Sequence, residues 1–221
     1  MSTLTTTNWL ELVEQITPER PLILSHVTWD EYEDLLKQVG EPAGLRISYN
    51  DGRLQIMSLS AEHEKYVRFL EKMIAAMSLR LNLVILSFGS ATMKKQKRDK
   101  GNEPDACFYV QSAPLIGNRI QLDFAVDPPP DIAVEVNVHH ASDDKFSIYA
   151  GLGVGEVWLF DRQKLTIHLL QQGQYVEAEA SRALPMLSSR VLTDFLRRLP
   201  VEGEFQTLIA FDEWLQSLQR P

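Results

Sequence analysis

Residues 131–138 read Asp-Ile-Ala-Val-Glu-Val-Asn-Val, and this stretch decides the fold class. Most of its positions are apolar in succession, whereas a strand with one wet face would alternate apolar and polar residues. A strand of this kind is covered on both faces by other layers of the protein. The stretch therefore predicts a buried strand inside a sheet that lies between helices.

Two helical patterns and a hairpin precede this strand. Thr28 and Glu31 form the capping box of a helix that Gly40 ends. A longer helix is expected over Ser60–Leu81, with its apolar residues on one face. Between the two helices, residues alternate on both sides of Asn50-Asp51-Gly52, a turn sequence that predicts a β-hairpin.

Further elements are expected around the other apolar runs. Strands are predicted at about 83–87, 105–110, 155–161 and 164–170, and helices at about 143–151, 191–199 and 204–218. This order of helices and strands predicts an α/β (mixed α+β) fold, a mixed β-sheet flanked by helices. No repeat and no linker interrupts the chain, so we expect a single domain over residues 1–221.

Composition and charge exclude several classes of protein. No apolar run reaches the roughly 18 residues that span a bilayer, so we expect no membrane partner. The start of the chain lacks the pattern of a secretory signal, and the single cysteine, Cys107, cannot form an internal disulfide; a cytoplasmic location fits best. The formal net charge of −8 would repel nucleic acid, so a polyanion needs a local basic patch.

Such a basic patch lies at residues 93–100, which read Met-Lys-Lys-Gln-Lys-Arg-Asp-Lys. Lys94, Lys95, Lys97 and Arg98 are its candidates for contacts with a phosphate backbone, although a solvated loop is the simpler interpretation. The phosphate-loop, dinucleotide and nucleophile-elbow motifs are absent from the sequence. The sequence therefore gives no motif for nucleotide hydrolysis, dinucleotide redox chemistry or serine-hydrolase chemistry.

Two carboxylates indicate where chemistry takes place. Glu135 lies in the middle of the apolar strand, where a charge is costly unless it is paired or bound to a metal. Asp105 opens another apolar strand. Carboxylates on neighbouring strands can share a hard cation such as Mg²⁺ beside a phosphate substrate. The alternatives are that Asp105 accepts backbone hydrogen bonds at the strand entry and that Glu135 pairs with an arginine in the core.

Three further residues are candidates for the same site. Lys145 lies in the short helix after the central strand, where its ammonium would hold water or stabilise developing charge; it is equally suited to a surface ion pair. His63 and Glu64 begin the long helix and would add a ligand or orient a phosphate, unless they only face solvent. His139 and His140 point to opposite faces of a strand and cannot readily bind one metal together.

Three blocks of the sequence are similar to those of a known protein family. They are Glu103-Pro-Asp-Ala-Cys-Phe-Tyr-Val110, Pro129-Pro-Asp-Ile-Ala-Val-Glu-Val136, and a tail from Asp144-Lys145 through Tyr149 and Gly153-Val154 to Glu156-Val-Trp-Leu-Phe-Asp161. With these blocks the chain resembles the Uma2 family of bacterial restriction endonuclease-like proteins, in the PD-(D/E)XK nuclease superfamily. The likeness covers about residues 28–199, which would form the core, with a helical C-terminal extension at 200–221.

The resemblance implies a restriction-endonuclease-like core and hydrolysis of phosphodiester bonds with Mg²⁺, or Mn²⁺, as cofactor. It implies that Asp105 and Glu135 hold the metal, with Glu64 as an additional acidic ligand and the Val136 carbonyl as a further one. The chain also departs from the superfamily pattern. The E-x-K lysine of the superfamily would stand at position 137, where this chain has asparagine, and Lys145 resembles a relocated lysine.

The leading hypothesis is therefore a Mg²⁺-dependent endonuclease that acts on duplex DNA. Asp105 and Glu135 would bind the metal, Lys145 would position or deprotonate water, and Glu64 and His63 would complete the shell. A homodimer is expected because cutting both strands needs two sites related by symmetry. The alternative is a nuclease-fold protein without catalysis that binds nucleic acid or protein, and a third is a small-molecule phosphodiesterase.

Overall fold

The computed structural model describes residues 8–17, 20–40, 44–136 and 144–219. The positions at 137, 139 and 140, which the sequence singles out, lie outside these ranges. In chain order, the elements are α1 (Trp9–Glu14), β1 (Leu22–Leu24), α2 (Trp29–Val39), β2 (Leu45–Asn50), β3 (Arg53–Ser58), α3 (Ala61–Leu81), β4 (Leu86–Ser87), β5 (Met93–Lys95), the 3₁₀ turn η1 (Gln96–Arg98), β6 (Lys100–Asn102), β7 (Ala106–Tyr109), α4 (Ala113–Ile116), β8 (Ile132–Val136), α5 (Asp144–Leu152), β9 (Glu156–Phe160), β10 (Leu165–Gln171), β11 (Gln174–Ala178), α6 (Ser189–Glu202) and α7 (Glu204–Leu218).

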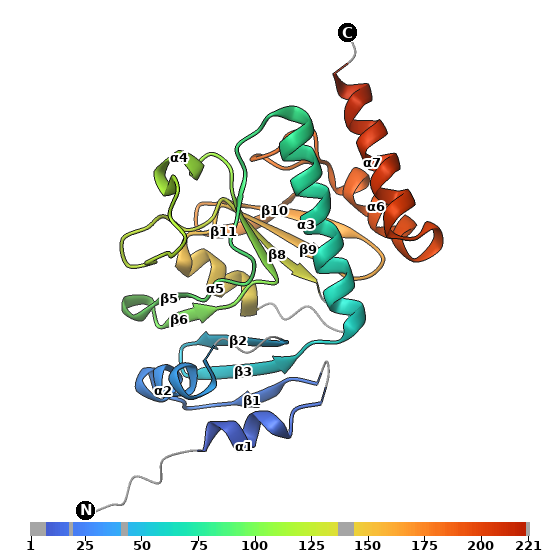
Figure 1. Ribbon diagram of the computed structural model, residues 1–221. Helices are drawn as coiled ribbons and strands as arrows, with labels where there is room; N and C mark the ends of the chain where they lie inside the picture. Colours follow the sequence, from blue (N-terminus) through green and yellow to red (C-terminus); the bar gives the residue numbers. More distant parts are fainter. Residues whose placement is uncertain (1–7, 18–19, 41–43, 137–143, 220–221) are drawn as a thin grey trace, which may run out of the picture.

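These elements form a mixed α/β fold, which confirms the expected fold class (Figure 1). The strands belong to two sheets, whereas the sequence suggested one. The six-stranded sheet has the order β11-β10-β9-β8-β7-β4, and only β8 and β9 in it are parallel. The five-stranded sheet has the order β1-β3-β2-β6-β5 and is antiparallel throughout.

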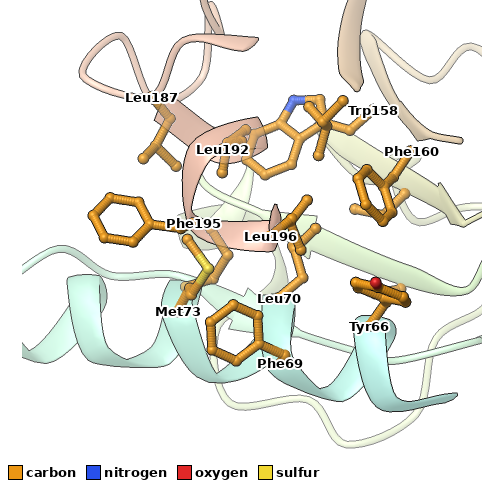
Figure 2. Packing of buried hydrophobic residues seen from close by; sticks show 14 of the residues in the cluster. Tyr66, Phe69, Leu70, Met73, Trp158, Phe160, Leu187, Leu192, Phe195 and Leu196 are labelled. Atoms are coloured by element: carbon orange, nitrogen blue, oxygen red, sulfur yellow. The ribbon is translucent and has the colours of Figure 1, made fainter. Parts of the chain in front are cut away.

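The central strand β8 is buried at all five positions, as its apolar sequence predicts. Val134 and Val136 point into a core that α3, α6 and α7 cover, and Ala133 points into a second core under α5. In Figure 2, Leu70 and Met73 of α3 face Leu192 and Leu196 of α6, in the same cluster as Trp158 and Phe160. Successive residues of β8 thus pack against helices on opposite faces of the sheet.

The hairpin β2–β3 builds a separate small core with α2. Its two-residue loop is Asp51-Gly52, and both residues have positive φ, 47° and 81°, as a tight hairpin turn of the primed type requires. Tyr49 of β2 stacks on Tyr32 of α2, with ring centroids 4.8 Å apart. The hairpin belongs to the five-stranded sheet, called the hairpin sheet below, and α1 and α2 cover its apolar face.

The two sheets meet where the chain passes from β6 to β7. Only Glu103, Pro104 and Asp105 separate the last residue of β6 from the first residue of β7. The helix α5 packs against β6 and β2 as well as against the six-stranded sheet. Polar residues of both sheets therefore converge at this junction. No helix within the described ranges is both long and apolar enough to cross a membrane.

Candidate active site

Asp105 is the buried centre of one half of the site. Arg46 Nε of β2 donates to its Oδ1 at 3.0 Å. Its Oδ2 accepts the Val136 backbone N–H at 2.7 Å and lies 2.9 Å from His63 Nε2 at the start of α3. Only 2% of Asp105 is exposed. The carboxylate thus connects the hairpin sheet, the long helix and the central strand.

Glu135 is the centre of the other half and is 1% exposed. The strand pairing of Ala106 with Val134 brings it beside Asp105, because the two acidic residues directly flank that pair. Its Oε2 accepts a hydrogen bond from Lys145 Nζ, and its Oε1 accepts one from the Tyr149 hydroxyl. The site therefore has a carboxylate on each of two paired strands, at one end of β8.

The helix α5 supplies the partners of Glu135 through its own geometry. Lys145 and Tyr149 are four residues apart, so they lie on one face of the helix, one turn after the other. Both side chains are buried and reach the same carboxylate. Of the two interpretations of Lys145, the structure thus places its ammonium inside the site and not in a surface pair.

The charges in the network fix two protonation states. Burial by itself raises the pKa of Asp105, but the hydrogen bond and charge of His63, with the charges of Lys145 and Arg46, outweigh burial and lower it below its usual value. The pKa of Tyr149 is raised well above its usual value by burial and by the neighbouring Glu135 carboxylate. Asp105 is therefore ionised at neutral pH, and Tyr149 remains a hydrogen-bond donor.

The first turn of α3 places its two candidate residues differently. The Ser60 side chain caps the helix by accepting the His63 N–H at 3.2 Å, and the His63 side chain is buried against Asp105. Glu64 is partly exposed and lies 3.7 Å from Arg46 Nη2 and 3.3 Å from Arg68 Nη2. His63 thus belongs to the buried network, whereas Glu64 joins it through Arg46.

Sequence reasoning missed four residues of the site: Arg46, Ser48 and Asn102 were not singled out, and Tyr149 was interpreted as a core aromatic. Asn102 Nδ2 donates to Glu135 Oε1 at 3.2 Å, and its Oδ1 accepts from Ser48 Oγ at 2.5 Å. Arg46 and Ser48 alternate with the apolar residues of β2 that face the hairpin core, so both lie on the opposite face. The polar face of this predicted strand was the sequence signal by which Arg46 and Ser48 could have been found.

The cations of the basic patch at residues 93–100 lie apart from the buried carboxylates. It forms the β5–β6 hairpin with the 3₁₀ turn between the strands. Lys94 Nζ pairs with Glu33 of α2 at 2.8 Å, and Lys95 Nζ donates to the Leu152 carbonyl at 2.7 Å. Lys97 and Arg98 are exposed in the turn. The four cations therefore do not join the buried network, and only two of them are fully presented to solvent.

The donor set suits a hard divalent cation. Among the residues that the structure describes, no group of three or more His, Cys, Asp or Glu side chains is arranged as a preformed metal site. Asp105 and Glu135 nevertheless supply carboxylate oxygens, the ligands that Mg²⁺ and Mn²⁺ prefer. Arg46 and Lys145 now balance these two charges, so an incoming cation would compete with two internal cations.

Comparisons with known proteins bear on the fold and the family of the chain. A crystal structure of "a putative nuclease belonging to DUF820" from Anabaena variabilis is similar at 16% sequence identity and a TM-score of 0.52, over 77% of this chain and 99% of that one. At this identity, the likeness supports the fold alone. No curated protein matches. The Uma2 family model, described as "Putative restriction endonuclease", matches residues 29–202, and the chain therefore belongs to the Uma2 family.

Proposed function

We propose that this chain is a divalent-metal-dependent endonuclease that hydrolyses phosphodiester bonds of DNA at Asp105 and Glu135. Membership of a nuclease-like family supports a nuclease-like function. One observation carries the finer proposal: the ammonium of Lys145 reaches Glu135 from the helix that follows β8. This contact supports the proposal that Lys145 of α5 replaces the lysine that the superfamily pattern places two residues after the glutamate.

The roles of the residues follow from their contacts. Asp105 and Glu135 would hold Mg²⁺ or Mn²⁺, with the Val136 carbonyl and Glu64 as further oxygen donors. The cation, when bound, supplies a Lewis acid for the phosphoryl oxygens. Lys145 then holds and orients the attacking water.

The neighbouring residues fix the two carboxylates. His63 and the Val136 N–H hold Asp105 in position. Tyr149 and Asn102 do the same for Glu135, because each donates a hydrogen bond to its Oε1. These positioning contacts keep both carboxylates on the same side of the strand end.

We also propose duplex DNA as the substrate, with the nucleic-acid contacts at Lys94, Lys95, Lys97 and Arg98, and a homodimer as the form that cuts both strands. A cytoplasmic location accompanies this proposal, because the free Cys107 thiol is compatible with a reducing compartment.

Plasmid nicking tests the proposed function. Purified protein is incubated with supercoiled plasmid and Mg²⁺ or Mn²⁺, beside Asp105→Ala and Glu135→Gln. We expect the wild type to convert the plasmid to nicked and linear forms and both variants to fall to background. Glu177→Gln, at an exposed surface ion pair, is the matched control and should cleave like the wild type. Cleavage by folded Glu135→Gln at the wild-type rate would show that the assigned site is wrong.

A second candidate function is a nuclease-fold module that binds nucleic acid or protein without cutting. It is favoured by one observation: each carboxylate already has a cationic partner, Arg46 for Asp105 and Lys145 for Glu135. Calorimetric titration with Mn²⁺ separates the two candidates. A nuclease should bind the ion in a way that Asp105→Ala abolishes, whereas an inactive module should show the same weak heat with and without Asp105.

A further inference from the structure

A groove of about 1020 Å³ is lined by Arg46, the residue that donates a hydrogen bond to Asp105. One wall comes from the start of β2, the first turns of α3 and the residue after β6, and it carries the charged side chains of Arg46, Glu64, Arg68 and Glu103. The other wall comes from the loop after β4 and the loop after α4, and it carries Phe88 and Phe124. The groove thus carries two arginines, two glutamates and two phenylalanines, and Arg46 links it to Asp105.

Arg46 connects the groove to the buried network. It is 6% exposed, its Nε donates to Asp105 at 3.0 Å, and its Nη1 donates to the Leu45 carbonyl at 2.8 Å. Within the described residues, its Nη2 makes only the 3.7 Å contact to Glu64. A guanidinium has five N–H donors in a planar fork that matches a phosphate. Arg46 can therefore hold a phosphate while it keeps its bond to Asp105.

Both phenylalanines of the groove pack against other apolar or aromatic residues. Phe88 packs edge-on against Tyr109, with centroids 5.6 Å apart and planes at 80°. Phe124 packs against the core under α5. Beside them, Ile120 is 91% exposed and adds an apolar side chain to the groove lining. An aromatic surface of this kind is a platform on which a base can stack.

We propose that this groove binds unpaired nucleotides next to the bond that is cut, with their phosphates at Arg46 and Arg68 and their bases against Phe88 and Phe124. The inference rests on the proposed function, because it takes Asp105 and Glu135 as the cleavage site. In a duplex, the base faces are stacked and only the base edges are accessible. An unpaired base, by contrast, presents its face to an aromatic ring. The substrate class is thus duplex DNA that carries a single-stranded segment at the cleavage point, which narrows the duplex substrate proposed above.

The size of the groove agrees with this occupant. Pockets that enclose a small-molecule ligand have volumes of about 300–1,000 Å³. A volume of about 1020 Å³ therefore suits a short unpaired segment. The neighbouring charges add a constraint, since Glu64 contacts both arginines and limits how strongly they attract a polyanion. Stacking, not charge alone, should then carry much of the affinity.

Fluorescence anisotropy tests the inference without any cleavage. A fluorescein-labelled single-stranded oligonucleotide of about twelve nucleotides and the blunt duplex of the same sequence are titrated in the absence of divalent metal. We expect the wild type to bind the single strand at least about tenfold more tightly. Phe88→Leu and Phe124→Leu keep apolar packing but remove the stacking surface, and each should weaken single-strand binding about 5- to 20-fold.

The controls separate stacking from folding. Phe205→Leu changes an exposed phenylalanine on α7, outside the groove, and should bind like the wild type. Ile120→Ser changes an exposed groove side chain without touching the core, and should weaken single-strand binding even if the phenylalanine variants fold poorly. Equal affinity for single strand and duplex, or groove variants that bind like Phe205→Leu, would overturn the inference.

A cleavage assay distinguishes failure of the inference from failure of the proposed function. A duplex with a single-stranded flap is compared with a blunt duplex in Mg²⁺, and the flapped substrate should be cut faster. Cleavage of both substrates at one rate, unaffected by Phe124→Leu, would overturn the groove assignment and leave the nuclease intact. Stacking-dependent single-strand binding without cleavage of either substrate would support the groove and overturn the nuclease.

Discussion

Asp105 shows how a single buried charge depends on contacts from distant parts of the chain. Its partners come from β2, α3 and β8, and together they lower its pKa despite its burial. Such a charge is tolerated only because every oxygen has a donor. The same contacts make it costly to replace.

Replacement of Asp105 by asparagine should destabilise the metal-free protein. The change leaves the buried Arg46 cation without its counter-ion, and removal of one partner of a buried pair costs about 3–5 kcal/mol. The free energy of unfolding, from urea denaturation at neutral pH, measures this loss. Asp194→Asn, at an exposed ion pair, is the control and should change stability by less than about 0.5 kcal/mol.

The pH dependence gives a second measurement on the same variant. The folded pKa of Asp105 lies below its ordinary value of 3.8, so the ionised carboxylate stabilises the fold above that pH. This contribution is lost as the pH falls through the folded pKa. The stability difference between wild type and Asp105→Asn should therefore shrink in acid. A difference that stays constant down to pH values well below 3.8 would contradict the assignment.

At the scale of elements, helix starts are fixed by short-range contacts. Glu31 N–H donates to Thr28 Oγ1 at 3.3 Å, and the Thr28 N–H donates to Glu31 Oε2 at 2.7 Å, which completes the capping box of α2. The backbone and side-chain hydrogen bonds from Thr28 also lower the pKa of Glu31. The sequence pattern predicted this box because both partners lie within one turn.

Thr28→Ala should therefore destabilise α2 and the hairpin sheet that it covers. Loss of an N-cap side chain costs about 1 kcal/mol. For a chain of this length, that loss lowers the melting temperature by about 2–4 °C. Thr28→Ser keeps the hydroxyl and should melt with the wild type. If Thr28→Ser fell as far as Thr28→Ala, the effect would come from the lost methyl group and not from the cap.

At the scale of the whole molecule, the two sheets differ in protection. β8 lies inside the six-stranded sheet with all its residues buried, whereas β1 lies at the edge of the five-stranded sheet and is only partly covered. Native-state hydrogen exchange should find the slowest amides on β8 and its neighbours and much faster exchange on β1. Uniform protection across both sheets would mean that the molecule opens as one unit.

The junction of the sheets also explains why the site lies where it does. Asp105 lies between the last strand of the hairpin sheet and β7, and Glu135 belongs to the six-stranded sheet. The contacts of the two carboxylates therefore connect both sheets. A cation or substrate bound there would contact both sheets. The site is thus a property of the whole molecule and not of any one element.

Several features were determined by the sequence alone. The capping box of α2, the Asp51-Gly52 turn, the buried strand β8 and the helix α7 follow from residues close in the chain. The sequence also singled out Asp105, Glu135, Lys145 and His63, because charged or polar residues stood beside apolar runs. The structure places these four side chains in two adjoining groups, Asp105 with His63 and Glu135 with Lys145, and their catalytic roles stay predictions.

Only the tertiary structure decided the rest. It separated the strands into two sheets, placed Arg46 and Asn102 against the carboxylates, and opened the groove between β2 and the loop after α4. The physical reason is that a turn or a cap depends on contacts within a few residues. The pairing of strands and the partners of a buried charge depend on packing between distant segments, and the backbone of a strand can pair with any other.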